Sequence, residues 1–191
     1  MGRPVEFDRP TAVNRALALF WRQGYQATSL ADLLPAMGIS RSSFYAAFGD
    51  KRGFFIECLD LWAARTLQLL NDQRNGLPPI DALQKFFERS VAEALGPKVN
   101  WGCMLVNTVL EMSGVDDELA TRASTHMADM ERIFQDSLQD AGATPAQAEK
   151  MAAMLMLFNE GIRVSSRRRL PEAQQLQSIS TTFGLVRSAL A

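Results

Sequence analysis

The stretch from Thr28 to Lys51 constrains the fold more than any other part of the chain, because it reads as two short helices joined by a tight turn. Thr28 is expected to cap the first helix, since its hydroxyl can accept a hydrogen bond from a backbone N–H near the helix start. Gly38 stands where that helix must end and the chain must enter a positive φ. The first helix is predicted from apolar residues that share one face: Leu30, Leu33, Leu34 and Met37.

A second short helix is predicted for residues 41–48, with Ser40 as its N-cap. Phe44 and Phe48 are four residues apart, so both point back at the first helix. The opposite face carries small or hydrogen-bonding side chains: Arg41, Ser42, Ser43 and Tyr45. A helix that exposes such groups near its N-terminus can enter the major groove of DNA. The spacing alone also fits a helical hairpin inside an ordinary bundle.

The identities of the residues in this stretch indicate a particular motif more strongly than their helical spacing does. Residues 38–45 read Gly-Ile-Ser-Arg-Ser-Ser-Phe-Tyr, residues 48–51 read Phe-Gly-Asp-Lys, and a long apolar helix follows. This pattern resembles the helix-turn-helix signature of the TetR family of bacterial transcriptional regulators. Five upstream residues fit the same signature: Phe20, Gly24, Tyr25, Thr28 and Leu30. The motif covers about the first 60 residues, and the rest of the chain agrees in length and helical layout.

The resemblance implies an all-α protein with two domains. A three-helix helix-turn-helix DNA-binding domain would span residues 1–50, and a helical bundle for ligand binding and dimerisation would span residues 51–191. Helical spacing of apolar residues runs through the whole chain, and no segment reads as a strand. Helices are predicted at about 10–23, 51–72, 80–95, 101–112 and 116–140, from 145 to the arginines at 167–169, and across 176–190.

Charge is distributed unevenly along the sequence. Residues 1–55 carry seven Lys and Arg side chains against four Asp and Glu side chains, a formal charge of +3. The whole chain has a formal charge of −1, so the remainder carries −4. A basic end on an acidic body is typical of a small DNA-reading domain attached to a larger domain that does not touch DNA.

Composition argues against several other classes of protein. Hydrophobic residues make up 47% of the chain, too many for a disordered protein. No apolar run reaches the length of a membrane span and no signal segment is recognisable, so we expect a cytoplasmic protein without a membrane partner. Cys58 and Cys103 do not make a disulfide framework, and the single histidine, His126, lacks the neighbours of a metal site. No cofactor is expected.

The family resemblance assigns DNA contacts to the matching positions. Ser42 and Ser43 would reach base edges, and Arg41 would serve a guanine or a phosphate. Phosphate contacts, which position a domain without specifying sequence, are expected from three residues: Thr28, Tyr45 and Lys51. Many family members carry a large polar residue where this chain has Ala46 and Ala47. Alanine can meet a thymine methyl but cannot donate, so either the three preceding residues read the bases or the operator is read partly by shape.

The effector pocket and the dimer interface are expected in the second domain. An apolar and aromatic pocket wall with one polar anchor is predicted from seven residues: Trp62, Trp101, Cys103, Met104, Asn107, Met127 and Phe158. Each of these residues also fits an ordinary core position. In the family, the last two helices of each subunit form a four-helix interface, which here implies Leu155, Phe158, Ile162, Leu176, Ile179 and Phe183.

The predicted function is therefore a ligand-responsive transcriptional regulator, expected to be a repressor. A homodimer would bind a near-palindromic double-stranded DNA operator, and a small apolar or amphipathic effector would release it.

Two alternatives remain open at this stage. The pair Gly102-Cys103 resembles a subgroup of the family, and a thiol at a helix N-terminus has its thiolate favoured by the helix dipole, so Cys103 could sense electrophiles or oxidants. Most free cysteines are instead small buried apolar residues. The other alternative is a helical carrier or enzyme without DNA binding, although no catalytic constellation stands out.

Overall fold

The structure is a computed structural model that describes residues 7–93, 101–168 and 170–191. Within these ranges it contains nine α-helices and no strand, which confirms the predicted all-α fold. The helices are α1 (Arg9–Gln23), α2 (Leu30–Met37), α3 (Arg41–Phe48), α4 (Lys51–Arg74), α5 (Pro79–Glu93), α6 (Met104–Met112), α7 (Asp117–Asp140), α8 (Pro145–Arg167) and α9 (Glu172–Leu190). The predicted end of the fifth helix at Leu95 lies outside the described residues. No helix of the described ranges has both the length and the apolar character that a membrane crossing requires.

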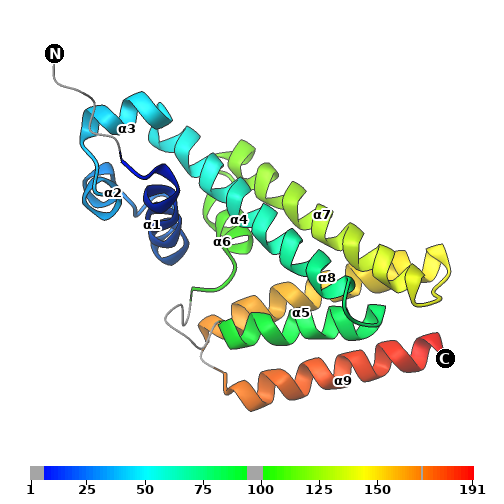
Figure 1. Ribbon diagram of the computed structural model, residues 1–191. Helices are drawn as coiled ribbons and strands as arrows, with labels where there is room; N and C mark the ends of the chain where they lie inside the picture. Colours follow the sequence, from blue (N-terminus) through cyan, green and yellow to red (C-terminus); the bar gives the residue numbers. More distant parts are fainter. Residues whose placement is uncertain (1–6, 94–100, 169) are drawn as a thin grey trace.

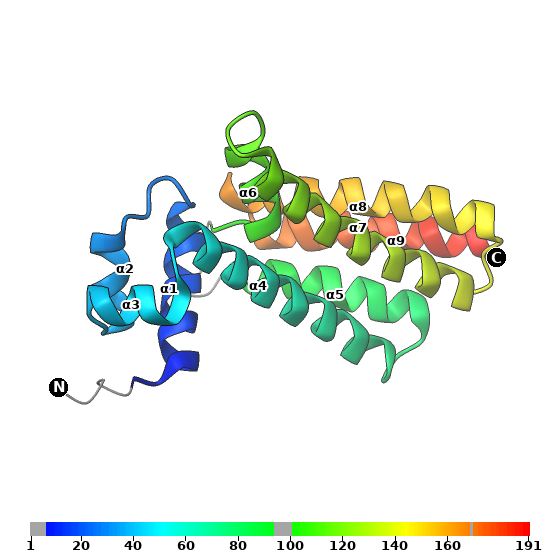
Figure 2. The ribbon, with the colours of Figure 1, turned by 90° about the horizontal axis from the view of Figure 1, so that it is seen from above.

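Helices α1, α2 and α3 gather at one end of the molecule, and the C-terminus lies at the opposite end (Figures 1 and 2). The long helix α4 starts beside α3 and runs away from this end along α7 to reach α5. Helices α5, α7, α8 and α9 form the larger bundle, in which α5 contacts each of the other three. The short helix α6 packs on α7 and α4, next to the end that holds α1. Helices α4 and α6 therefore connect the two ends.

The N-cap of α2 is Ser29, not Thr28 as predicted. The Ser29 hydroxyl accepts from the backbone N–H of Asp32, and the Asp32 carboxylate accepts from the backbone N–H of Ser29, which completes a capping box. Thr28 is instead buried, and its hydroxyl donates to the carbonyl of Gly24 at 2.6 Å. Thr28 and Ser29 both carry a hydroxyl that can cap a helix. Ser29 is the cap because Asp32, three positions later, can complete the capping box with it.

Helix α6 begins at Met104, with Cys103 as its N-cap, rather than at Trp101 as predicted. The backbone carbonyls of Trp101 and Gly102, the two residues before this N-cap, accept hydrogen bonds from side chains. The Asn107 amide donates to the carbonyl of Trp101 at 2.7 Å, and the Trp21 indole N–H donates to the carbonyl of Gly102 at 3.0 Å. The first bond ties residue 101 to α6 itself, and the second ties residue 102 to α1.

Two hydrophobic clusters make up the core. The first combines α1, α2, α3 and the first half of α4 with side chains of α6 and the start of α7. The second combines the end of α4 with α5, α8, α9 and the rest of α7. The first cluster continues across residue 50, so α4 and α6 share one core with the N-terminal helices. The domain boundary at residue 50 stays a prediction.

Candidate DNA-binding and effector sites

Helix α3 buries its aromatic residues and exposes its polar ones, as predicted. Phe44 has no exposed surface and Phe48 is buried, and both rings pack against Phe54 of α4. Arg41 and Ser42 are exposed at the start of the helix, and Tyr45 is 46% exposed one turn later. The exposed side of α3 therefore offers a guanidinium group, a serine hydroxyl and a phenol to a partner outside the molecule.

The N-terminus of α3 is ordered by three serine hydroxyls. The Ser40 hydroxyl accepts from the backbone N–H of Ser43 at 3.1 Å, which confirms Ser40 as the N-cap. The same oxygen lies 2.9 Å from the hydroxyl oxygens of both Ser42 and Ser43. Ser43 is half-buried, whereas Ser42 is exposed. The hydroxyls are thus positioned before any partner arrives, and Ser42 is the more accessible of the two predicted base readers.

The residues predicted to contact phosphate at the edges of the motif differ in their surroundings. The buried Thr28 hydroxyl points at Gly24, so it is not presented to a phosphate. The Lys51 ammonium lies 4.3 Å from the centre of the Tyr25 ring, a cation–π arrangement at the start of α4. Partial burial lowers the pKa of Lys51, against the opposing effects of Glu111 and Asp32. Lys51 is the first residue of α4, three positions after the end of α3.

A cavity of about 260 Å³ lies between α1, α4, α5 and α8. Its wall is half apolar and half polar: Leu17, Trp21, Trp62, Arg65, Thr66, Leu69, Phe86, Arg89, Ser90 and Arg163. Trp62 alone among the residues predicted for the effector pocket lines it. The cavity is therefore nearer to α1, and more polar, than the sequence indicated.

The other predicted pocket residues are divided between the two cores. Trp101 packs edge-on against Trp21, with ring centres 5.4 Å apart, and Asn107 is bound to the carbonyl of Trp101. Cys103 and Met104 are buried in the first core, and Met127 borders both cores. Phe158 stacks on Phe87 in the second core, with ring centres 5.8 Å apart. These side chains do not form one common pocket.

Arg163 lines the cavity but was not predicted from the sequence, although its position on α8 is unusual for a charged residue. Helix α8 buries a stripe at helical spacing, Ala152, Leu155, Met156, Asn159, Ile162 and Arg163. A charged residue on a mostly apolar inward face is uncommon. The position of Arg163 on this stripe could have indicated a polar cavity.

Of the two interpretations of Cys103 that the sequence left open, the structure favours the small buried apolar residue over the reactive thiol. Cys103 is 3% exposed, and this burial raises the pKa of its thiol. Arg163 and the backbone N–H groups of Val106 and Leu105 oppose the increase, so the predicted effect of the helix terminus is present but smaller than the effect of burial. Burial also raises the pKa of Cys58.

Comparison with known proteins decides the family. Residues 13–58 match the family described as bacterial regulatory proteins, tetR family. Residues 79–181, more than half of the chain, match the family described as the transcriptional regulator LmrA/YxaF-like, C-terminal domain. The chain belongs to the TetR family. The resemblance inferred from the motif is thereby confirmed, and this TetR-family protein is a transcriptional regulator with a helix-turn-helix DNA-binding domain.

Individual relatives agree over nearly the whole length. The HTH-type transcriptional repressor ComR of Escherichia coli K12 is 31% identical over 195 aligned residues, which cover 96% of this chain and 91% of ComR. The structure of a cysteine mutant of the TetR-family regulator CifR, complexed with 26-bp double-strand operator DNA, has a TM-score of 0.81 at 30% identity, with 95% and 98% of the two chains covered. SCO4454, a TetR-family regulator of Streptomyces coelicolor, shares the fold with a TM-score of 0.84 at 15% identity and 95% coverage of both chains.

Most residues predicted for the dimer interface are buried within this TetR-family chain itself. Leu155, Ile179 and Phe183 have no exposed surface, and Ile162 is 6% exposed. Phe158 and Leu176, the two remaining members of that set, are partly buried and pack against the second core. The apolar side chains that α8 and α9 expose occupy neighbouring positions: Met154, Leu157, Val164 and Leu185.

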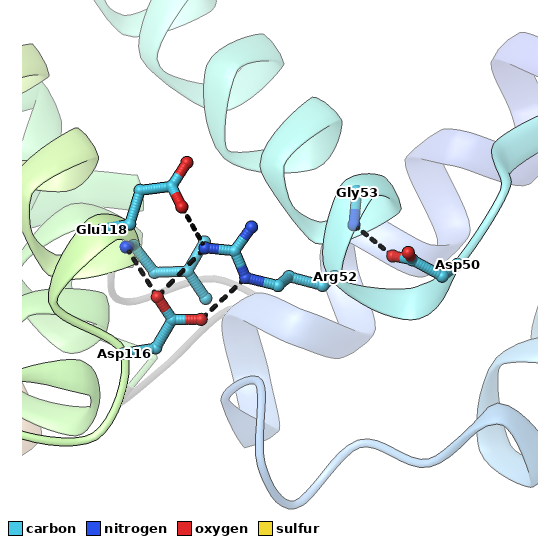
Figure 3. A network of polar contacts seen from close by, with 6 residues as sticks. Asp50, Arg52, Gly53, Asp116 and Glu118 are labelled. Atoms are coloured by element: carbon cyan, nitrogen blue, oxygen red, sulfur yellow. Dashed lines mark hydrogen bonds and ion pairs between the residues drawn. The ribbon is translucent and has the colours of Figure 1, made fainter.

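Polar links join the helix-turn-helix end of this regulator to α6 and α7. The Glu111 carboxylate of α6 accepts from the backbone N–H groups of Tyr25 at 2.9 Å and of Gln26 at 2.7 Å. At the start of α4, the Arg52 guanidinium donates to Asp116 at 2.7 and 3.1 Å and to Glu118 at 2.8 Å, as Figure 3 shows. These bonds fix α6 and the start of α7 to the segment that positions α2 and α3.

Proposed function

We propose that this chain is a transcriptional repressor that binds a near-palindromic operator as a homodimer and is released by a small-molecule effector. The observation that carries this proposal is the exposed N-terminal side of α3, where Arg41, Ser42 and Tyr45 face outward above a buried aromatic core. ComR, which is similar over nearly its whole length, is named as a repressor, and the CifR mutant is described in complex with operator DNA. Operator binding implies a cytoplasmic protein located on the nucleoid.

Each exposed residue of α3 has a role that its chemistry allows. Arg41 can donate to the O6 and N7 atoms of a guanine, and the hydroxyls of Ser42 and Ser43 can bond either to a donor or to an acceptor on a base edge. The exposed methyl groups of Ala46 and Ala47 can contact thymine methyls. These side chains would specify the sequence of a half-site.

Phosphate contacts would fix the position of the domain on the duplex. Tyr45 can donate its hydroxyl to a phosphate oxygen, and Lys51 can contribute its positive charge. Thr28 would contribute only through its backbone, because its hydroxyl is bound to Gly24.

The exposed apolar residues of α8 and α9 would form the dimer. Leu157 is 70% exposed and Leu185 is 67% exposed, and burial of such side chains stabilises an interface. Symmetric pairing of these helices would place two copies of α3 on successive major grooves, roughly 34–36 Å apart or more. An effector that binds better to a different spacing of the two copies would then lower the affinity for the operator.

DNA binding is tested by fluorescence anisotropy with DNA from the region upstream of the protein's own gene, across a range of salt concentrations. We expect specific binding that weakens with salt, because phosphate contacts release counterions. Arg41→Ala should cost roughly 1–3 kcal/mol of binding free energy if Arg41 reads a base. Arg132→Ala, on α7 with a side chain that is 70% exposed, is the matched control and should have no effect. Failure to bind any site across genomic DNA would contradict the proposal.

A further inference from the structure

The cavity between α1, α4, α5 and α8 has a strongly cationic wall. Three of its ten lining residues are arginines, Arg65, Arg89 and Arg163, and none of the ten is acidic. Arg163 is 9% exposed and therefore belongs to the interior of the cavity. Arg65 and Arg89 are exposed, so they lie where the cavity meets solvent. Two guanidinium groups therefore lie at the mouth of the cavity and one lies inside it.

The neutral donors of the wall already donate to the backbone. The Thr66 hydroxyl donates to the carbonyl of Trp62, the Ser90 hydroxyl donates to the carbonyl of Phe87, and the Trp21 indole donates to the carbonyl of Gly102. A guanidinium group carries five N–H donors in a planar fork, so it can bind a ligand in addition to a partner within the chain. The arginines are therefore the groups that would recognise a polar ligand, and their planar forks match the two oxygens of a carboxylate.

The remaining wall favours a flat apolar body. Five apolar side chains line the cavity: Leu17, Trp21, Trp62, Leu69 and Phe86. The ring centres of the two tryptophans lie 5.8 Å apart in an edge-to-face arrangement. The volume of about 260 Å³ is close to the lower end of ligand pockets, roughly 300–1,000 Å³. Such a space fits one or two fused rings rather than a large drug-like molecule.

We propose that this cavity is the effector site and that its effector is a small aromatic carboxylate, with the carboxylate bound by Arg163. The proposal rests on the proposed function, since it names the ligand that releases the operator. Leu17 and Trp21 belong to α1, whereas the rest of the wall belongs to α4, α5 and α8. A ligand here contacts α1, which packs on α2 and shares a core with α3, so its binding can favour one position of α1 over another.

The test compares a charged ligand with an uncharged ligand of the same shape on the full-length protein. Isothermal titration calorimetry at neutral pH measures the affinity for 1-naphthoate and benzoate and for the corresponding amides, 1-naphthamide and benzamide. At least one carboxylate should bind about tenfold or more tightly than its amide, a difference of about 1.4 kcal/mol. Saturating carboxylate should also weaken operator binding in the anisotropy assay by about tenfold.

Four variants separate the role of Arg163 from a general effect on folding. Arg163→Met should remove the preference for the carboxylate, and Arg163→Lys should keep part of it. Arg65→Gln, at an exposed position, should reduce the preference by a smaller factor without disturbing the core. Arg132→Met, outside the cavity, should change nothing. Circular dichroism melting establishes that each variant is folded.

Four results would overturn the proposal. Two concern the ligands: amides that bind as tightly as the carboxylates, and failure of both carboxylates to bind at roughly 1 mM. The other two are a preference for the carboxylate that survives in Arg163→Met and carboxylate binding that leaves operator affinity unchanged. The calorimetric comparison needs no DNA. A protein that bound no operator would therefore refute the proposed function, while the titration would still decide the class of ligand.

Discussion

The contact of Glu111 with the backbone of Tyr25 and Gln26 gives a quantitative prediction about the joint between α6 and the helix-turn-helix segment. In Glu111→Gln the side chain keeps its shape but loses its charge, and one of its two terminal atoms becomes an N–H₂ donor that faces a backbone N–H. A hydrogen bond to a charged group contributes about 1.5–3 kcal/mol. Because Glu111 is half-buried and one acceptor remains, we expect the free energy of unfolding to fall by about 1–2 kcal/mol.

Urea unfolding followed by circular dichroism measures this loss. Glu149→Gln is the matched control, because it removes the same charge from an exposed position on α8 and should change the free energy of unfolding by less than about 0.5 kcal/mol. A change in Glu111→Gln as small as that of the control would refute the reasoning.

Gly24 supplies an independent check of the same joint. A Cβ at residue 24 would lie 2.6 Å from Glu111 Oε2, and the φ of Gly24 is 88°. Gly24→Ala should therefore destabilise the protein by at least about 1 kcal/mol, through both backbone strain and this close approach. In a Glu111→Ala background the close approach is absent, so Gly24→Ala should cost less by about 0.5 kcal/mol or more. Equal costs in the two backgrounds would show that the carboxylate does not constrain residue 24.

The dimer face, the thiols and the core of α3 can be tested with simpler assays. Leu157→Glu should convert the dimer to a folded monomer in size-exclusion chromatography with light scattering, and a persistent dimer would place the interface elsewhere. Burial raises the pKa of both Cys58 and Cys103. Their reaction with a disulfide reagent at pH 8 should therefore be at least about tenfold slower in the native protein than in urea. Rapid labelling of Cys103 in the native protein would instead support a thiol-based sensor. Phe44→Ala should lower the free energy of unfolding by about 3–5 kcal/mol, and a loss below about 1 kcal/mol would mean that α3 is not anchored by this ring.

Local signals predicted the helix-turn-helix segment well, because its structure depends on neighbours in sequence. The Ser40 cap, the buried Phe44 and Phe48 and the start of α4 after Asp50 all follow from residues within one or two turns. The one local error, Thr28 in place of Ser29, came from two adjacent hydroxyls whose competition is settled by Asp32. Even this error was resolvable from the capping-box spacing.

The cavity and the dimer face could not be predicted in the same way, because each depends on how distant helices pack. The cavity wall comes from four helices, and Arg163 becomes significant only when α8 faces the same cavity as α1, α4 and α5. On α8, two apolar stripes lie one residue apart, with Leu155 buried and Met154 exposed. Periodicity finds both stripes but does not tell which one faces the chain's own core.

The links around α1 limit how an effector can act. Trp21 is tied to residue 102, and Tyr25 and Gln26 are tied to Glu111 by bonds of 2.7–3.0 Å. Hydrogen bonds weaken steeply when their geometry departs from this range, so α1 cannot shift by much more than about 1 Å without either carrying α6 along or breaking them. If α6 moves with α1, Glu111→Gln should weaken the coupling between effector and operator. If the bonds break instead, Glu111→Gln should lower operator affinity in the absence of any effector, and anisotropy measured with and without 1-naphthoate separates the two mechanisms.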